Sequence, residues 1–403
     1  MASSVPRICC LDLDTFFVSV ERLLDPTLRD KPVVVGGRKG GRGVVTSCSY
    51  DVRACGVRSG MSIREASSLA PHAVFLPGHH DAYGRYSTSA REIVERYSPT
   101  VRAASIDEQY VDFHGCERLY QRPGDADDDA TILRVVREMT GAIDRELGLP
   151  ASAGIATSVS MAKVACGLAK PHGVLLVAAG AEAATLAPLP VRKLPGIGPV
   201  SEARLRKIGV LTLGDLAVVA EPLLRPIFGC YTTSIRAAAV GLGAAMLGRE
   251  RPAFHEHDPR GESVGSISNE RTFVETSPRA TEAILCSLSE RVCHRARVRG
   301  VVARCVTLKL RYTDFQTLSR ARTLLPTNSE IVVHRVILEL HAEARTRDLP
   351  VRLLGVQLSR LSVEDGQLEL FDAERRRAAA LDRVRARFGY DAVRLATARL
   401  TER

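Results

Sequence analysis

Two short acidic stretches, roughly a hundred residues apart, contain the side chains best suited to chemistry. Asp12 and Asp14 stand at the end of one apolar run, and Asp107 and Glu108 stand within another. Carboxylates among apolar residues are costly to bury without a counter-charge. Divalent metal ions would supply that charge, and paired metals held by carboxylates are a device for phosphoryl transfer. Acidic residues at strand ends also serve as helix caps or turn residues, so either stretch alone allows that simpler interpretation.

Other side chains suit the binding of an anion. Tyr50 and Arg53 are three residues apart and would share one face of a helix. The planar guanidinium of Arg53 matches phosphate oxygens, and Lys170 offers a point charge. On their own, these three side chains would be assigned to a solvated surface. Phe16 and Phe17 follow the first acidic stretch; Phe16 is expected in the core, and Phe17 is bulky enough to exclude a ribose 2′-hydroxyl.

Two further features favour contact with nucleic acid. Gly196 and Gly198 stand in a segment that resembles a helix-hairpin-helix, where glycines let backbone N–H groups approach a phosphate. Residues 262–361 contain 16 Lys and Arg against 10 Asp and Glu. Lys309 and Arg311 alternate with leucines there and would share one polar face of a strand. Such a face grips phosphates without reading bases, although a glycine-rich connection and a solvated basic face remain the simpler alternatives.

Composition limits the class of protein. The chain has 403 residues, 45% of them hydrophobic and 25% charged, with a formal net charge of +10. These values predict a globular protein of two to four domains with an anionic partner. The ten cysteines lack metal-ligand spacing and suit a reducing compartment. No signal peptide or apolar spanning segment is evident, so we expect a cytoplasmic protein with no membrane association.

Strands and helices interleave in the first half, which predicts an α+β domain with an inserted subdomain. The patterns predict strands over residues 7–13, 31–37, 44–47, 103–113 and 152–156, and helices over 16–24, 50–55, 62–69, 81–97, 130–147 and 160–169. Residues 179–242 read as helices with short loops, and 249–261 as a linker. A strand is predicted over 305–312, and a charged helix from Ala373.

Taken together, these motifs resemble those of the Y family of translesion DNA polymerases, in particular its bacterial members. The similar segments are residues 11–21, 45–53, 56–61, 105–108, 169–173, 263–273 and 308–315. The resemblance implies a right-hand architecture with palm, small fingers, helical thumb and a DNA-gripping little finger. It implies the following boundaries: palm 1–18 and 80–177, fingers 19–79, thumb 178–248, linker 249–261, little finger 262–361 and tail 362–403.

The resemblance also implies roles for individual residues. Asp12, Asp107 and Glu108 would hold two magnesium ions, with the Leu13 carbonyl as an extra ligand. The nucleotide would contact Phe16, Phe17, Ser47, Tyr50, Arg53 and Lys170, with Phe17 as the steric gate against ribonucleotides. Gly196, Gly198, Lys309 and Arg311 would bind the primer–template. The implied activity is template-directed, low-fidelity DNA synthesis past damaged bases, by transfer of a nucleotide from a dNTP to the primer 3′-hydroxyl.

The tail and two departures from the family's pattern complete the expectations. Gln367, Leu368, Leu370 and Phe371 belong to a segment that resembles the peptide by which bacterial polymerases dock on the sliding clamp, although a packed tail could use the same side chains. The role of residues 372–403 stays open. Gln109 stands where the family usually has a small residue, and Val159 where it commonly has a lysine. The alternative functions are a catalytically silent adaptor with this fold and a plain DNA-binding protein; a monomer is the default.

Overall fold

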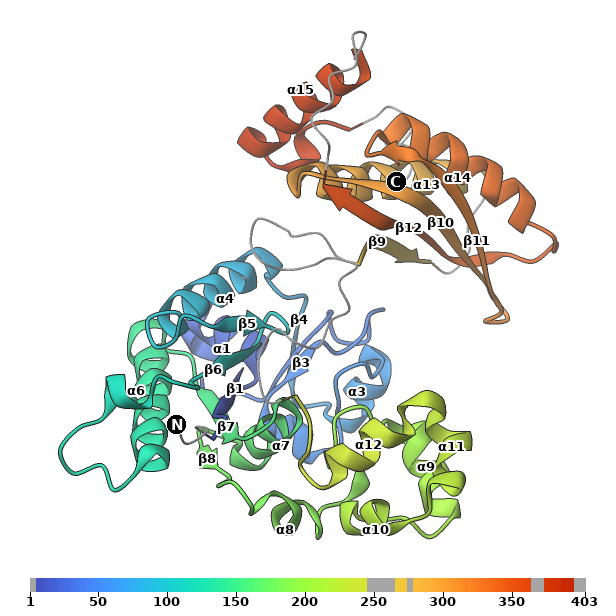
Figure 1. Ribbon diagram of the computed structural model, residues 1–403. Coiled ribbons are helices and arrows are strands. Elements are labelled where there is room, and N and C mark those ends of the chain that lie inside the picture. The colour runs from blue at the N-terminus through green and yellow to red at the C-terminus, as the bar shows by residue number, and fades with distance from the viewer. Residues whose placement is uncertain (1–4, 245–264, 274–277, 364–372, 395–403) are drawn as a thin grey trace. The chain divides into compact units, whose positions relative to one another are not determined.

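The computed structural model describes residues 5–244, 265–273, 278–363 and 373–394. Compact packing divides the chain into two units, residues 1–250 and 251–403. Each unit has its own sheet and hydrophobic core (Figure 1).

The first unit is built on a five-stranded sheet in the order β5-β6-β1-β7-β8. These strands are β5 (Val101–Ala103), β6 (Glu108–Asp112), β1 (Ile8–Leu13), β7 (Ala151–Ala156) and β8 (Val174–Leu176). The central strand β1 is antiparallel to both β6 and β7. The predicted single strand over 103–113 is wrong, because residues 104–107 form a turn that separates β5 from β6.

Helices cover both faces of this sheet. The larger core lies against α1 (Phe16–Leu24), α4 (His80–Val94) and α6 (Asp128–Leu147), and it receives Cys9, Leu11 and Leu13 from β1. Side chains alternate along a strand, so Ile8, Cys10 and Asp12 point to the other face. That face is covered by α7 (Val159–Ala169), which packs on β1 and β7. The catalytic candidates therefore sit on the α7 side of the sheet.

Gly154 allows α7 to lie directly against β7. A Cβ atom at this position would stand 2.0 Å from the backbone nitrogen of Cys166 and 2.4 Å from the carbonyl oxygen of Ala162. Any side chain would therefore push the helix off the strand. This close approach fixes the position of α7 and of every residue that the helix carries.

A smaller sheet, β3-β2-β4, is inserted between α1 and α4. Its strands are β2 (Val33–Val35), β3 (Ser47–Cys48) and β4 (Val74–Leu76), and its helices are α2 (Tyr50–Ala54) and α3 (Ile63–Leu69). It has a separate core that includes Val34, Cys48 and Val52. The predicted strand over 44–47 is wrong, because Val44 forms only an isolated bridge and β3 starts at Ser47.

The remainder of the first unit is helical, as predicted. The short helix α5 (Glu117–Tyr120) precedes α6, and residues 179–242 contain α8 (Glu182–Leu186), α9 (Pro199–Lys207), α10 (Leu213–Val218), α11 (Glu221–Phe228) and α12 (Thr232–Ala239). Short 3₁₀ turns span Pro26–Leu28, Val191–Lys193 and Gly229–Tyr231.

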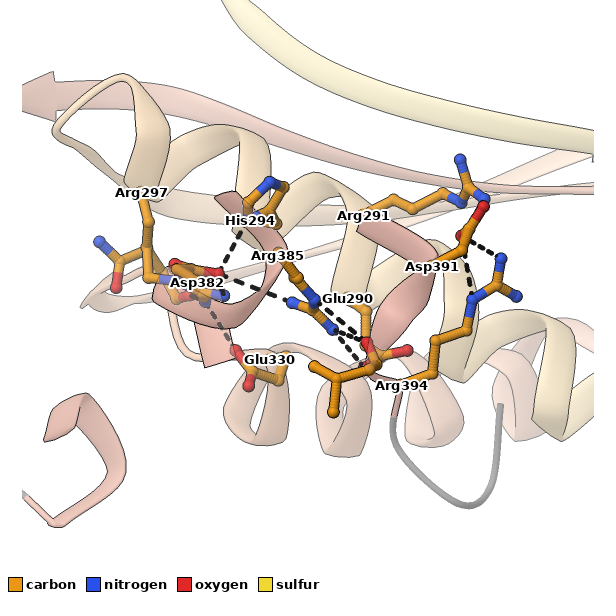
Figure 2. Close-up of polar contacts among 11 residues, drawn as sticks. Glu290, Arg291, His294, Arg297, Glu330, Asp382, Arg385, Asp391 and Arg394 are labelled. Carbon is orange, nitrogen blue, oxygen red and sulfur yellow. Dashed lines mark hydrogen bonds and ion pairs between the residues drawn. The ribbon is translucent and has the colours of Figure 1, made fainter. Parts of the chain in front are cut away.

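The second unit is an antiparallel sheet in the order β11-β10-β12-β9. Its strands are β9 (Ser266–Thr272), β10 (Val301–Tyr312), β11 (Thr317–Thr327) and β12 (Val351–Val363). Helices α13 (Pro278–Val298) and α14 (Glu330–Ala344) cover one face, with Leu308 and Leu310 in the core between them. The predicted tail helix is confirmed as α15 (Ala373–Phe388), which is followed by a 3₁₀ turn, Tyr390–Ala392. Polar contacts connect α15 to α13 (Figure 2).

Candidate active site

Three carboxylates lie in the region where β1 and β6 are side by side. Asp12 in β1 is directly opposite Glu108 in β6. Asp107 occupies the turn before β6, where the Leu13 backbone nitrogen donates to its carbonyl oxygen at 2.9 Å. Two segments far apart in the chain thus bring the predicted triad together.

Two lysines, one on α7 and one directly after its last residue, face two of these carboxylates. The Lys170 ammonium group donates to Asp12, and the Lys163 ammonium group donates to Glu108. Burial raises the pKa of Asp12; the neighbouring lysine opposes this shift, and the other two carboxylates add to it. Burial lowers the pKa of Lys163, but the hydrogen bond and charge of Glu108 outweigh burial and raise it.

Lys163 was missed by sequence reasoning. It lies on a helix that was predicted, seven residues before a lysine that was selected. Lys170 directly follows the last residue of α7, so Lys163 lies about two helical turns before that end of the helix. That spacing was the available signal, and it points to Lys163 only once Lys170 is placed.

Asp14, left without a role by sequence reasoning, is a buried anchor of the site. Only 1% of its surface is exposed. Its carboxylate accepts hydrogen bonds from Tyr50 Oη at 2.9 Å, Ser152 Oγ at 2.7 Å and the His172 backbone nitrogen at 2.9 Å. Burial, followed by the charge and hydrogen bond of Asp14, raises the pKa of Tyr50. Asp14 therefore ties the smaller sheet and the segment after α7 to the central strand.

A cavity of about 220 Å³ opens beside the triad. The predicted residues that line it are Asp12, Leu13, Phe16, Phe17, Ser47, Arg53, Asp107 and Lys170. Thr15, Thr46 and Ser59 line it too and were not predicted. Glu108 and Tyr50 are not among the lining residues; Glu108 stands opposite Asp12, and Tyr50 is bound to Asp14.

Phe17 is held in place by an aromatic stack. Its ring lies 4.1 Å from that of Tyr83, centroid to centroid, with the planes 13° apart. The Tyr83 hydroxyl donates in turn to the buried carboxylate of Glu21. Phe16 is only 2% exposed and packs in the core, as expected, although its side chain also reaches the cavity. A rigid ring at Phe17 can exclude a substituent by its volume.

The predicted DNA contacts lie elsewhere in the two units. Gly196 has φ of 93°, which favours glycine, and Gly198 precedes the first turn of α9. Lys309 and Arg311 lie on the face of β10 opposite the helices, as the alternation predicts. The Lys309 ammonium group pairs with Glu270 at 2.8 Å, and Arg311 donates to Thr317 at 2.8 Å. Their side chains thus form a polar sheet face.

The departures and the tail peptide have different outcomes. Gln109 is 3% exposed, and its Oε1 is buried without a hydrogen-bond partner in the described parts of the chain. Val159 begins α7 and packs against the core. The predicted clamp-binding residues Gln367, Leu368, Leu370 and Phe371 lie outside the described residues.

The donor set fits a hard divalent cation. Three carboxylates and the Leu13 carbonyl are oxygen ligands, which Mg²⁺ prefers, and phosphate oxygens could complete its coordination. Burial raises the pKa of Asp12, and the negative charges of Asp107 and Glu108 raise it further; a bound dication would stabilise the charged carboxylate against both effects. Within residues 5–244, 265–273, 278–363 and 373–394, no three His, Cys, Asp or Glu side chains are already gathered as a metal cage. Asp12 and Glu108 would have to turn from their lysines to bind one.

Comparison with known proteins identifies the same regions. The sequence matches the model of the impB/mucB/samB family over residues 11–167, the C-terminal domain of that family over residues 264–370, and the IMS family HHH motif over residues 180–210. The chain is 36% identical over 397 residues to the DNA polymerase IV of Dehalococcoides mccartyi strain CBDB1, with 97% of each chain covered. No helix in the described part of the chain is long and apolar enough to cross a membrane.

Two solved structures share the fold. The insertion ternary complex of Dbh DNA polymerase matches with a TM-score of 0.63 and 21% identity, over 89% of this chain and 99% of that one. A Y-family DNA polymerase chimera, Dbh-Dpo4(243-245)-Dbh, matches with a TM-score of 0.72 and 22% identity, with the same coverage of both chains. These matches confirm the predicted α+β right-hand fold with palm, small fingers, helical thumb and little finger. The chain belongs to the impB/mucB/samB family, the Y family of DNA polymerases.

Proposed function

We propose that the cavity beside Asp12 is the site where this chain adds a deoxynucleotide to a primer 3′-hydroxyl, directed by a template strand. One observation carries the proposal: carboxylates, an arginine, a lysine and a rigid aromatic ring from distant segments line one cavity. Membership of the Y family makes the chain a DNA-directed DNA polymerase of the translesion type, which copies past damaged bases. Polymerases of this family depend on divalent metal ions.

In this proposal Asp12, Asp107 and Glu108 hold two magnesium ions, with the Leu13 carbonyl as a further ligand. When bound, these ions would activate the primer hydroxyl and stabilise the charge of the leaving pyrophosphate. The protein's own contribution is to hold the oxygen ligands at the edge of a rigid sheet. The register of β1 with β6 supports this, because it keeps Asp12 opposite Glu108.

Four residues bind the triphosphate in this proposal: Ser47, Tyr50, Arg53 and Lys170. Arg53 is oriented by a hydrogen bond from its Nε to the Cys48 carbonyl oxygen at 3.2 Å and lies over the Tyr50 ring at 5.3 Å. A guanidinium held in this way can offer its remaining donors to phosphate oxygens. Phe17 stands at the same cavity, where its ring would meet the 2′-hydroxyl of a ribonucleotide.

DNA is held outside the cavity. The Gly196 and Gly198 turn would present backbone N–H groups to a phosphate, and Lys309 and Arg311 would contact the duplex backbone from the polar face of β10. The proposed boundaries are palm 1–18 and 80–177, fingers 19–79, thumb 178–248, linker 249–261, little finger 262–361 and tail 362–403. Sequence-independent phosphate contacts suit an enzyme that must work on any template.

The proposal also includes the location, the oligomeric state and one protein partner of the enzyme. We place it in the cytoplasm as a monomer that docks on the sliding clamp through residues 367–371. The sequence of that segment supports the clamp contact, since leucine and phenylalanine anchors after a polar lead-in fit a hydrophobic groove.

Primer extension tests the proposed activity. Purified protein with Mg²⁺, four dNTPs and a primed template should add the nucleotides that the template specifies, and EDTA should stop the addition. A template with an abasic site should still be copied. The silent adaptor predicts DNA binding without synthesis under every metal condition, and that result would overturn the proposal.

A further inference from the structure

Helix α7 and the residue that directly follows it present two ammonium groups to two carboxylates that are partners across strands. Lys170 pairs with Asp12, and Lys163 pairs with Glu108. Lys170 has a proposed role on the triphosphate, but Lys163 has none. It does not line the cavity, and its ammonium group donates to Glu108.

The Lys163–Glu108 pair is held on both sides. Glu108 is fixed by the pairing of β6 with β1, and its side chain is only 13% exposed. Lys163 is fixed because α7 lies against β7 at Gly154, and because the Cys166 thiol donates to the Ser152 carbonyl at 3.4 Å. The backbone positions of both partners are therefore set by the packing of β6 and α7, while the Lys163 side chain itself stays partly exposed.

The contact is made by a carboxylate oxygen that the proposed metal would need. Lys163 Nζ donates to Glu108 Oε2, so a dication that takes this oxygen must displace the ammonium group. The ammonium group also repels a dication nearby, since like charges destabilise each other strongly in a partly buried site. Lys163 is 42% exposed, so its side chain has room to swing toward solvent.

We propose that Lys163 is a positioning residue that holds Glu108 and competes with the divalent cation for it. The inference rests on the proposed function, because it assumes that Glu108 is a metal ligand. Its consequence is that the two carboxylates stay compensated by lysines and bind a lone dication weakly. Full loading then requires the additional oxygen ligands that a nucleotide triphosphate brings.

The test measures metal binding directly, without catalysis. Mn²⁺ is titrated into chelator-treated protein in the absence of nucleotide, and free Mn²⁺ is followed by electron paramagnetic resonance. Lys163→Met should bind Mn²⁺ about threefold to tenfold more tightly than the parent, because it lacks the competing charge. Lys163→Arg keeps the charge and should bind like the parent. Lys31→Met, which removes an exposed lysine outside the cavity, is the matched control and should also bind like the parent.

A second readout separates competition from a general change in charge. In EDTA, the Tm of Lys163→Met should fall, because Glu108 loses its partner beside Asp12. Added Mn²⁺ should raise the Tm of this variant more than it raises that of the parent. Lys31→Met should show neither change.

The possible results separate a failure of the proposed role of Lys163 from a failure of the proposed metal site. Unchanged or weaker Mn²⁺ binding by Lys163→Met, with binding that Asp107→Ala abolishes, would overturn the role of Lys163 and leave the metal site intact. Binding that Asp107→Ala does not affect in any of these proteins would overturn the metal site itself. Tighter binding by Lys163→Met alone, lost in the double variant with Asp107→Ala, is the result we expect.

Discussion

At the scale of single residues, Asp14 connects more of the site than any ligand of the proposed metals does. Its three hydrogen-bond donors, from Tyr50, Ser152 and His172, lie 36, 138 and 158 positions away in the chain. No local pattern could show these contacts, because they exist only in the folded sheet. The resemblance of the sequence to the Y family predicted that Asp12, Asp107 and Glu108 act together, but the sequence could not indicate which acidic residue was an anchor.

We predict that Asp14→Ala weakens both stability and nucleotide binding. Each buried donor left without a partner costs about 1–3 kcal/mol in the free energy of unfolding. Tyr50 and the segment at His172 would also lose their attachment to β1, so KM for the dNTP should rise about tenfold or more. Urea unfolding and steady-state kinetics check the two effects. Asp14→Asn, which keeps one carbonyl acceptor, should be intermediate, and parent-like values for Asp14→Ala would contradict the anchor role.

The second prediction for a single residue concerns the role of Phe17 in sugar discrimination. Phe17→Ala should raise the efficiency of ribonucleotide insertion, relative to deoxynucleotide insertion, by about tenfold or more, because the ring stacked on Tyr83 would no longer meet the 2′-hydroxyl. Single-nucleotide insertion with matched dNTP and rNTP gives the ratio of kcat/KM values. Phe17→Leu should lie between the two. If sugar discrimination is the same in all three proteins, another residue is the gate.

At the scale of elements, the strand that carries Asp12 was predictable and the one that carries Glu108 was only partly so. Residues 8–13 are apolar except for Asp12, and the structure places β1 there. The turn at 104–107 contains neither glycine nor proline, the strongest turn signals in a sequence. It is closed instead by the Ser105 hydroxyl, which accepts hydrogen bonds from the Asp107 and Glu108 backbone nitrogens at 3.3 and 3.1 Å. In the sequence, Ser105 looks like an ordinary strand residue, so this turn was not predicted.

The tail helix shows the same limit of prediction from sequence. The helix itself was predicted from the sequence, but its packing against α13 was not. Helix α15 lies beyond residue 370, where the match to the family's C-terminal domain ends. The Arg385 guanidinium donates to Glu290 of α13 at 3.0 Å, and the two side chains are 1% and 2% exposed (Figure 2). Asp382 binds Arg297 at 2.7 Å in the same interface.

We predict that Arg385→Met releases α15. Removing one member of a buried ion pair leaves the other charge uncompensated, at a cost of about 3–5 kcal/mol. Local opening should therefore rise about a hundredfold or more, and trypsin should cut α15 at its exposed arginines correspondingly faster. The double variant Arg385→Met/Glu290→Met removes both charges and should recover most of the protection. Equal cleavage of the parent and the single variant would show that the pair does not hold the helix.

At the scale of the whole molecule, the family's order of domains was readable because each domain leaves its own pattern. Helices without strands mark residues 179–242, and period-two alternation marks β10. The sequence could not show which polar and charged side chains on different elements interact with one another. Lys163, Asp14 and Arg385 all act on partners that are distant in sequence.

The second unit should lose stability in mild acid. Burial lowers the pKa of His334 and of His341 on α14, and the charge of Arg345 lowers that of His341 further. The unfolded chain, with an ordinary histidine pKa of about 6.5, then binds more protons than the folded one. Stability is therefore full above that pH and falls as the pH drops below it. Urea unfolding at pH 7.5 and 5.5 should show a smaller loss in His334→Gln/His341→Gln, and an equal loss would contradict the assignment.

The most direct test of the central claim is single-turnover incorporation by Asp107→Ala, measured beside its DNA affinity. Asp107 lines the cavity, takes no part in a core, and should be needed only for the metal-dependent step. The account predicts that the rate of nucleotide addition falls by at least a thousandfold while the Kd for primer–template changes less than threefold. Retained incorporation at a parent-like rate would contradict the assignment of the carboxylates and place the reaction elsewhere.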